Sequence, residues 1–277
     1  MKAEVSIESI PTSVDDEITA NLMNYFVPLS TVRRPRNSEP ILTFIGSGTL
    51  VEIHSQYYIL TAAHIWHEVE KEEELCLAVT TRYPSAFVIP RKAISAKQLW
   101  GTENPEWGPD LALLELPRAC VSIIATYKSF LNLALHKSMF DSHPPAEKAF
   151  WAVTRLVGQF SGVEQGSDTV EGDAQTRTFL GPVCHMHSRG GFDYFEPSAK
   201  LGLAGVPASF GGVSGGGLWE IGLSMKDSGT VYFDGRRYFR GVAFWQTAPS
   251  DGRRAIRCHG PRSIFEMAWE SWDLPKE

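Results

Sequence analysis

Short runs of β-branched, aromatic and other apolar residues recur along most of this chain, and they occur in two groups. In the first group, residues 41–53 and 57–62 are separated by residues 54–56, which have the composition of a hairpin turn. In the second group, residues 230–246 read as a hairpin that turns at the Asp-Gly pair of residues 234–235. Such runs with turn residues between them predict β strands. We therefore expect two packed β units.

The ends and the middle of the chain lack this strand pattern. Ile18, Leu22 and Phe26 recur at helical spacing, which predicts a short helix over residues 15–26. Residues 261–272 carry apolar side chains three and four positions apart, which predicts an amphipathic helix that packs on the body. We divide the chain into an N-terminal extension (1–36), a first β unit (37–121), a connection with one helix (122–148), a second β unit (149–260), and a C-terminal helix and tail (261–277).

Composition excludes several classes of partner. The chain has 277 residues, a net charge of −6 and a pI near 5.8, which argues against broad nucleic-acid binding. No apolar run approaches the roughly 18 residues of a membrane helix. The first 22 residues contain no apolar stretch of signal-peptide length. These observations predict a cytoplasmic protein with neither a nucleic-acid nor a membrane partner.

Cysteine and histidine usage does not favour a metal centre. The four cysteines are scattered, without a CxxC pair: Cys76, Cys120, Cys184 and Cys258. In a chain of this size they are expected to be reduced thiols. Residues 184–187, Cys-His-Met-His, would form a zinc site only with further ligands such as Cys258 or His259. Ordinary strand positions explain this run better, so we expect no metal and no cofactor.

Residues 209–219, SFGGVSGGGLW, concentrate glycines around Ser214. Glycine allows positive φ and close approach of another group, which suits a phosphate-binding loop, a linker or the position of a nucleophile. A phosphate loop needs a lysine after its glycines, but Leu218 and Trp219 follow here. The same apolar residues, with Phe210 on the other side, argue against a solvated linker. The nucleophile interpretation then depends on partners elsewhere in the chain.

Two other stretches contain candidate partners. His64 follows an apolar strand and two alanines, so the imidazole is expected at the strand's end. Asp110 stands just before the apolar residues 111–116, where a carboxylate can be buried and still reach a partner. Alone, each has a structural explanation, such as a turn residue. Together with Ser214 they have the order histidine, aspartate, serine that is found in chymotrypsin.

These residues and their surroundings resemble the chymotrypsin-like (trypsin-like) serine protease family, in a bacterial-type cytoplasmic form. The resemblance covers roughly residues 38 to 273, and the motifs occur together in the family's order. The matching motifs are TAAH (61–64), PDLALLEL (109–116), GVSGGG (212–217), GSGTLV before the histidine hairpin (46–51), and GVAFWQ, which is similar to the family's substrate-binding strand (241–246).

The resemblance implies an all-β fold of two six-stranded antiparallel barrels with the active site between them and a C-terminal α-helix. The first barrel would carry His64 and Asp110, and the second would carry Ser214. It implies that Ser214 attacks a peptide carbonyl, that His64 transfers the proton, and that Asp110 orients the imidazole. The main-chain N–H groups of Gly212 and Ser214 would form the oxyanion hole.

Three departures from the family's pattern bear on regulation. The family's aspartate before the serine, which pairs with a newly formed N-terminal amine, is Val213 here. This argues against activation by cleavage and leaves control to a protein partner, to the N-terminal extension or to substrate availability. Ile65 and Phe210 stand where cysteines are usual, so the familiar disulfides are missing.

The specificity pocket is predicted from the same resemblance. Its base would be Ala208, next to Ser209, and neither residue supplies a carboxylate to select Lys or Arg. A small or apolar substrate side chain is therefore expected. Phe244, Trp245 and Gln246 would form the substrate-binding wall, with Gln246 in place of a glycine.

Other groups and other functions stay open at this point. Arg257 or His259 could approach the pocket and select a polar or acidic side chain. The chain could also be a catalytically silent binding module with a protease fold, or an esterase that uses the same three residues. We expect a peptidase of restricted specificity that acts on a protein or peptide substrate under control of a partner.

Overall fold

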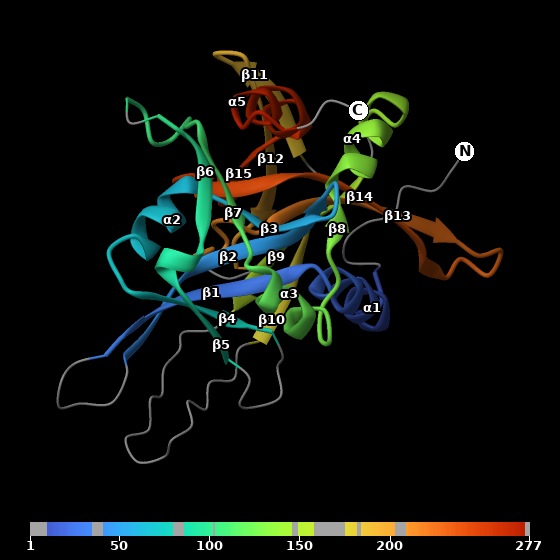
Figure 1. Ribbon diagram of the computed structural model, residues 1–277. Helices are drawn as coiled ribbons and strands as arrows, with labels where there is room; N and C mark the ends of the chain where they lie inside the picture. The colour runs from blue at the N-terminus through green and yellow to red at the C-terminus, as the bar shows by residue number, and fades with distance from the viewer. Residues whose placement is uncertain are drawn as a thin grey trace.

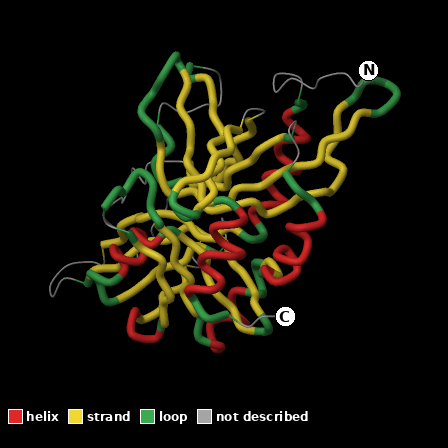
Figure 2. The backbone as a smooth tube through the Cα atoms, turned by 90° about the horizontal axis from the view of Figure 1, so that it is seen from above, coloured by secondary structure: helices red, strands yellow, loops and turns green. Residues whose placement is uncertain are grey.

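We describe the protein from a computed structural model of the whole chain (Figure 1). The described residues are 10–34, 41–79, 86–101, 103–145, 149–157, 175–181, 184–202 and 209–274. Strands dominate these residues, and they gather in two groups when the molecule is seen from above (Figure 2). No helix among the described residues is long and apolar enough to cross a membrane.

The first sheet follows the order β5-β4-β1-β2-β3-β7-β6, with the short β8 beside β2. Its neighbours along this path pair antiparallel, whereas β8 runs parallel to β2. The strands are β1 (Phe26–Arg33), β2 (Ile41–Ile53), β3 (Gln56–Thr61), β4 (Glu74–Ala78), β5 (Ala86–Pro90), β6 (Ser95–Trp100), β7 (Asp110–Glu115) and β8 (Leu131–Asn132).

The second sheet follows the order β10-β9-β13-β14-β15-β12-β11, and all of its pairs are antiparallel. Its strands are β9 (Phe150–Val157), β10 (Gln175–Gly181), β11 (Cys184–Arg189), β12 (Phe192–Lys200), β13 (Gly217–Met225), β14 (Val231–Gln246) and β15 (Arg253–His259). The far end of the β13–β14 hairpin projects from the body at the right of Figure 1.

The predicted fold class, all-β with two antiparallel units and a C-terminal helix, is confirmed. Among the described residues the first sheet has eight strands and the second has seven, against the six expected for each, and β8 of the first sheet comes from the predicted connection. The region predicted as an N-terminal extension, residues 1–36, requires a correction. Its strand β1 lies between β4 and β2 inside the first sheet, where seven of its eight residues are buried.

The two predicted hairpin turns have different outcomes. The turn between β2 and β3 is confirmed, with His54 and Ser55 at positive φ. The turn predicted at residues 234–235 is wrong: β14 continues through it, and the chain reverses at residues 226–230 instead. Gly235 has positive φ inside a β-bulge, and Asp234 accepts hydrogen bonds from the main chain and guanidinium of Arg236. The Asp-Gly pair, which is typical of turns, therefore forms a bulge inside a strand here.

Helices connect and cover the sheets. They are α1 (Thr12–Met23), α2 (Ala63–Val69), the short turn η2 (Arg91–Ala93), α3 (Arg118–Ile124), α4 (Leu133–Ser142), the π-helical segment η3 (Ser263–Ala268) and α5 (Trp269–Ser271). The N-terminal helix ends before Phe26, which begins β1, and residues 122–148 contain α4 as well as the end of α3. The C-terminal helix occurs as predicted and packs beside β12 (Figure 1).

One apolar cluster joins the two sheets to the terminal helices. It includes Leu60 and Leu113 from the first sheet and Trp219 from the second, all without solvent exposure. The helix α1 contributes Ile18 and Leu22, which are also fully buried. Because the cluster spans both sheets, the N-terminal helix stabilises their relative position through apolar burial.

Replacing Ile18 with alanine should lower the free energy of unfolding by about 2–5 kcal/mol, because it leaves a cavity in the inter-sheet cluster. Glu17→Ala, one position earlier on the exposed face of α1, should change it by less than about 0.5 kcal/mol. Urea denaturation of the full chain measures both. Equal stability of the two variants would contradict a structural role for α1.

Candidate active site

His64 lies where the first sheet gives way to helix α2. Strand β3 ends at Thr61, and Ala62 and Ala63 are fully buried, so the small side chains allow the backbone to pack closely at this point. The His64 side chain is about one third exposed (35%) and faces the pocket described below. The sequence prediction of an imidazole at the end of this strand is therefore matched by its position.

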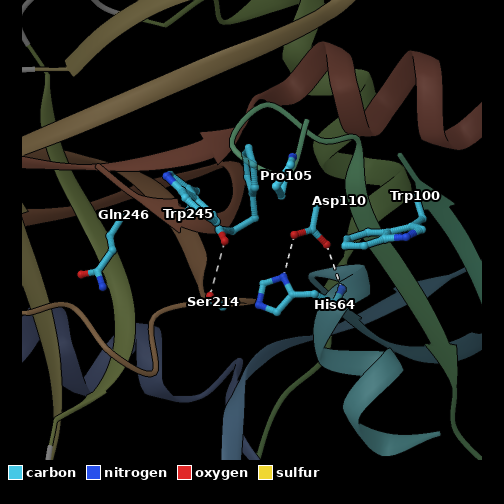
Figure 3. Close-up of a pocket in the computed structure, with 8 residues that line it drawn as sticks. His64, Trp100, Pro105, Asp110, Ser214, Trp245 and Gln246 are labelled. Atoms are coloured by element: carbon cyan, nitrogen blue, oxygen red, sulfur yellow. Dashed lines mark hydrogen bonds and ion pairs between the residues drawn. The ribbon is translucent and has the colours of Figure 1, made fainter. Parts of the chain in front are cut away.

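Asp110 is the first residue of β7, and its side chain is almost fully buried. Its Oδ1 accepts a hydrogen bond from the His64 main-chain N at 2.9 Å, and its Oδ2 lies 2.6 Å from the imidazole Nδ1 (Figure 3). Because a carboxylate only accepts hydrogen bonds, Nδ1 carries the hydrogen. In the neutral form of the ring the lone pair is then on Nε2.

Ser214 lies in a loop that is attached to both sheets. Ser47 of β2 donates from its main-chain N to the Ser214 carbonyl at 2.8 Å, and from its hydroxyl to the Gly212 carbonyl at 2.7 Å. On the other side, the Gly215 N–H donates to the Ala243 carbonyl of β14 at 2.7 Å. The main chain of the loop is thus held between β2 and β14.

Gly215 is required by this close approach. Its φ is +83°, and a Cβ atom there would lie 1.9 Å from the Ser47 carbonyl oxygen and 2.2 Å from the Thr61 hydroxyl. Gly211, in the same loop, has open space around the corresponding position. Glycines that look alike in the sequence therefore have different structural requirements.

Ser214 and His64 face one pocket but are joined by no hydrogen bond in the part of the chain that is described. The Ser214 hydroxyl instead donates weakly to the Phe244 carbonyl at 3.5 Å (Figure 3). The pocket has a volume of about 370 Å³. It is lined by His64, Trp100, Pro105, Asp110, Ser214, Phe244, Trp245 and Gln246.

The two predicted oxyanion donors belong to the loop that carries Ser214. Within the described residues, the main-chain N–H groups of Gly212 and Ser214 donate no hydrogen bond to the protein. Their neighbour Val213 closes a turn by donating to the Phe210 carbonyl at 3.2 Å. Val213 is itself 3% exposed and packs in an apolar cluster with Phe210 and Ala243.

The predicted specificity residues are brought together only in part. Trp245 and Gln246 line the pocket, and Gln246 Oε1 accepts hydrogen bonds from the Phe210 N–H at 3.0 Å and the Ser209 hydroxyl at 3.4 Å. Phe244 also lines it, although its side chain is 2% exposed. Ala208 lies outside the described residues.

Arg257 and His259 do not line the pocket, in contrast to the possibility left open from the sequence. Arg257 pairs with Glu196 and stacks on Trp107, with 3.6 Å between the guanidinium carbon and the ring centroid. His259 is fully buried behind Asp110. Both contact the segment of chain that leads into Asp110.

Sequence reasoning missed Trp100 and Pro105 on the opposite wall. Trp100 ends β6 and is 37% exposed, an unusual exposure for so large an apolar side chain. Its register opposite Asp110 on β7 brings it to the site. The signal available in the sequence was a tryptophan at a strand end near the aspartate motif.

The candidate metal ligands are used otherwise. His187 stacks on Tyr194 with 5.5 Å between the ring centroids, and Cys258 is fully buried in the second sheet. Burial raises the pKa of the Cys184 thiol to about 12, so this thiol stays protonated at neutral pH. Among the described residues, no group of three or more such side chains is placed to hold a metal ion.

Comparison with known proteins gives a likeness in structure. No protein-family model matches the chain, and no curated protein matches it. Among solved structures, the chain is similar to Rv3671c from M. tuberculosis H37Rv, in an inactive form with a serine-to-alanine mutation. The identity is 11%, the match covers 96% of this chain and 97% of that chain, and the TM-score is 0.46. A likeness of this level shows no activity of this chain.

Gly215→Ala should destabilise the fold by at least about 2 kcal/mol, because the added Cβ meets the Ser47 carbonyl and a left-handed φ is unfavourable for alanine. Gly211→Ala, in the same loop, should leave the free energy of unfolding within about 0.5 kcal/mol of wild type. Denaturant unfolding of both variants tests the contact without assuming any activity. A Gly215→Ala protein as stable as Gly211→Ala would contradict it.

Proposed function

We propose that this chain is a serine endopeptidase of the chymotrypsin-like type that acts through Ser214, His64 and Asp110. The observation that carries the proposal is the 2.6 Å contact between His64 Nδ1 and Asp110 Oδ2, at a pocket that Ser214 also lines. A buried carboxylate that fixes the imidazole tautomer, beside a serine hydroxyl, is the arrangement needed to activate that hydroxyl.

In the proposed reaction, the Ser214 hydroxyl turns from the Phe244 carbonyl toward His64, and its oxygen attacks the substrate carbonyl carbon. His64 Nε2 takes the proton and then gives it to the leaving amine as the peptide bond breaks. Water cleaves the resulting ester by the same steps, with His64 again transferring the proton. The N–H groups of Gly212 and Ser214, which donate to no acceptor among the described residues, would stabilise the oxyanion in both stages.

The loop that carries Ser214 (residues 209–216), here called the nucleophile loop, needs no ion pair to form in the proposed enzyme. Burial of Val213 in the apolar cluster with Phe210 supports a loop that is ordered without any new N-terminal amine. We therefore propose that control acts through access to the pocket, by a partner protein or by a narrow choice of substrate.

Restricted specificity is supported by the pocket wall. Gln246 is tied to the Phe210 N–H, so its side chain spans from β14 to the nucleophile loop. Trp100, Pro105 and Trp245 make the rest of the wall largely apolar. We propose that the site takes an extended peptide with apolar side chains and excludes bulky charged ones.

A second candidate is raised by the resting position of the Ser214 hydroxyl. Because Ser214 donates to Phe244 and not to His64, a catalytically silent binding module with the same fold would show the same resting geometry. Catalytic hydrogen bonds often tighten only when substrate binds, so this geometry is compatible with both. The experiments below separate the two.

A fluorophosphonate probe should label the wild-type chain at Ser214, and Ser214→Ala should abolish the labelling because the nucleophile is lost. Ser138→Ala removes an exposed serine on α4 and should label as wild type does. Intact mass spectrometry reads the added mass. An unlabelled wild type with no hydrolysis of peptides or esters would favour the binding module.

Asp110→Asn should lower kcat by about 10³- to 10⁴-fold, because the amide favours the wrong imidazole tautomer. Peptide and ester substrates with the same acyl part, assayed side by side, distinguish a peptidase from an esterase.

N-terminal proteomics that compares cells expressing the wild type with cells expressing Ser214→Ala would then give the cleavage sequence. Broad digestion of casein by the purified protein alone would contradict restricted specificity.

Gln246→Gly should broaden the accepted substrates, because it removes the side chain that spans to Phe210. A gain of about tenfold in kcat/KM for larger side chains at the cleavage position is expected, the scale of a few lost steric contacts in a pocket. A peptide library with all residues at that position measures it. An unchanged profile would place specificity elsewhere.

A further inference from the structure

We infer that His259 is a positioning residue of the active site, a buried imidazole of the second sheet that holds Asp110 in place for His64. The inference rests on the proposed function, since it concerns the same site. It assigns a role to a side chain that does not line the pocket and that has no contact with His64 or Ser214 among the described residues.

The contact is a hydrogen bond from the main chain of one sheet to a side chain of the other. The Asp110 N–H donates to His259 Nε2 at 3.0 Å, and the two residues are 149 positions apart in the sequence. His259 ends β15, where it pairs with Val242 on one side and Tyr194 on the other, and it has no solvent exposure. The rigid middle of the second sheet therefore supplies the acceptor.

His259 accepts a hydrogen bond at Nε2, and its Nδ1 is buried without a hydrogen-bond partner among the described residues. Because the Asp110 N–H is the donor, Nε2 carries the lone pair and the ring hydrogen lies on Nδ1. Burial lowers the pKa of His259 to about 3, with an opposing contribution from the Asp110 carboxylate, so the ring stays neutral at ordinary pH. Aromatic rings surround it: Phe192, Tyr194 and Phe244 have centroids 5.9, 5.4 and 4.2 Å away.

The same imidazole also reaches the other side of the site. It stacks on Phe244 with the ring planes 16° apart, and the Phe244 carbonyl is the acceptor of the Ser214 hydroxyl. One ring thus contacts both the residue that orients His64 and the strand segment beside the nucleophile. A shift of the His259 ring would therefore move Asp110 relative to Phe244.

The loop that leads into Asp110 is held by the second sheet at further points. Arg257 Nη1 donates to the Glu106 carbonyl at 2.6 Å, and the Tyr194 hydroxyl donates to the Trp107 carbonyl at 2.5 Å. Gly108 follows, and a Cβ atom there would lie 2.9 Å from His259 Nε2. These contacts hold the loop in place. His259 holds its last residue, Asp110, where β7 begins.

An ordinary structural role for His259 is the alternative, and the half-buried His136 provides a comparison outside the active site. His136 on α4 accepts from the Phe239 N–H through Nδ1 at 3.4 Å, and burial lowers its pKa to about 4. It faces a different pocket, near Arg237 and Tyr238. It therefore has the same kind of bond outside the active site.

The test compares His259→Leu, His259→Gln and His136→Leu in the full chain. Leucine removes the acceptor, whereas glutamine can present Oε1 near the position of Nε2. We expect His259→Leu to lower kcat on a peptide substrate by about 10- to 100-fold with KM little changed, the scale seen when a group that orients a metal-binding side chain is lost. His259→Gln should recover most of kcat, and His136→Leu should keep it.

A second readout does not depend on activity. The hydrogen on His64 Nδ1 lies between Nδ1 and Asp110 Oδ2, which are 2.6 Å apart, and it should give a low-field NMR resonance in the wild type. It should broaden or disappear in His259→Leu, return in His259→Gln and persist in His136→Leu. If the wild type shows this resonance and the variants respond as stated, but the wild type neither labels nor hydrolyses, the proposed function is refuted and the positioning role is supported.

The inference is overturned if folded His259→Leu keeps wild-type kcat and resonance, or if His136→Leu loses as much. If His259→Leu does not fold, His259→Gln and His259→Asn decide, because the shorter asparagine cannot reach the Asp110 N–H. Loss of kcat and resonance in the asparagine variant with retention in the glutamine variant supports the inference. Equal behaviour of the two overturns it.

Discussion

The site depends on how the two sheets meet. Asp110 begins a strand of the first sheet and His64 follows another, whereas Ser214 lies in the loop that leads into β13 of the second sheet. Ser47 is the central contact: its main-chain N binds the Ser214 carbonyl and its hydroxyl binds the Gly212 carbonyl. The Thr61 hydroxyl donates to the Ser47 carbonyl at 2.7 Å, which connects the same point to the strand that leads into His64. A short path of hydrogen bonds therefore links the proposed base to the proposed nucleophile.

Apolar burial stabilises the nucleophile loop where the resembling family uses an ion pair. Val213 is buried with Phe210 and Ala243, and burial of a valine side chain contributes about 1.5–3 kcal/mol. Unlike an ion pair, this contribution does not vary with the protonation of a partner. The buried Val213 therefore stabilises this loop conformation without a titratable partner.

Local patterns predicted much of this molecule, and contacts distant in sequence account for what they missed. Strand runs, the turn at residues 54–56 and the terminal helix follow from residue spacing, which acts over a few positions. Residues 26–33 were misassigned because a strand inside a sheet is defined by its neighbours, here β2 and β4. The Asp-Gly pair at 234–235 has the chemistry of a turn, but β13 continues beside it. Trp100 and His259 reach the site only through register and the meeting of the sheets.

The choice of histidine at position 259 follows from a requirement of the Asp110 backbone. Asp110 begins β7, and its N–H, which is buried, must find an acceptor or cost about 1–3 kcal/mol. A carboxylate acceptor there would add a second negative charge beside the Asp110 side chain, which is unfavourable in a buried site. A neutral imidazole accepts the hydrogen bond without charge and stacks on Phe244. The group that satisfies the backbone is therefore also the group that can set the position of the carboxylate.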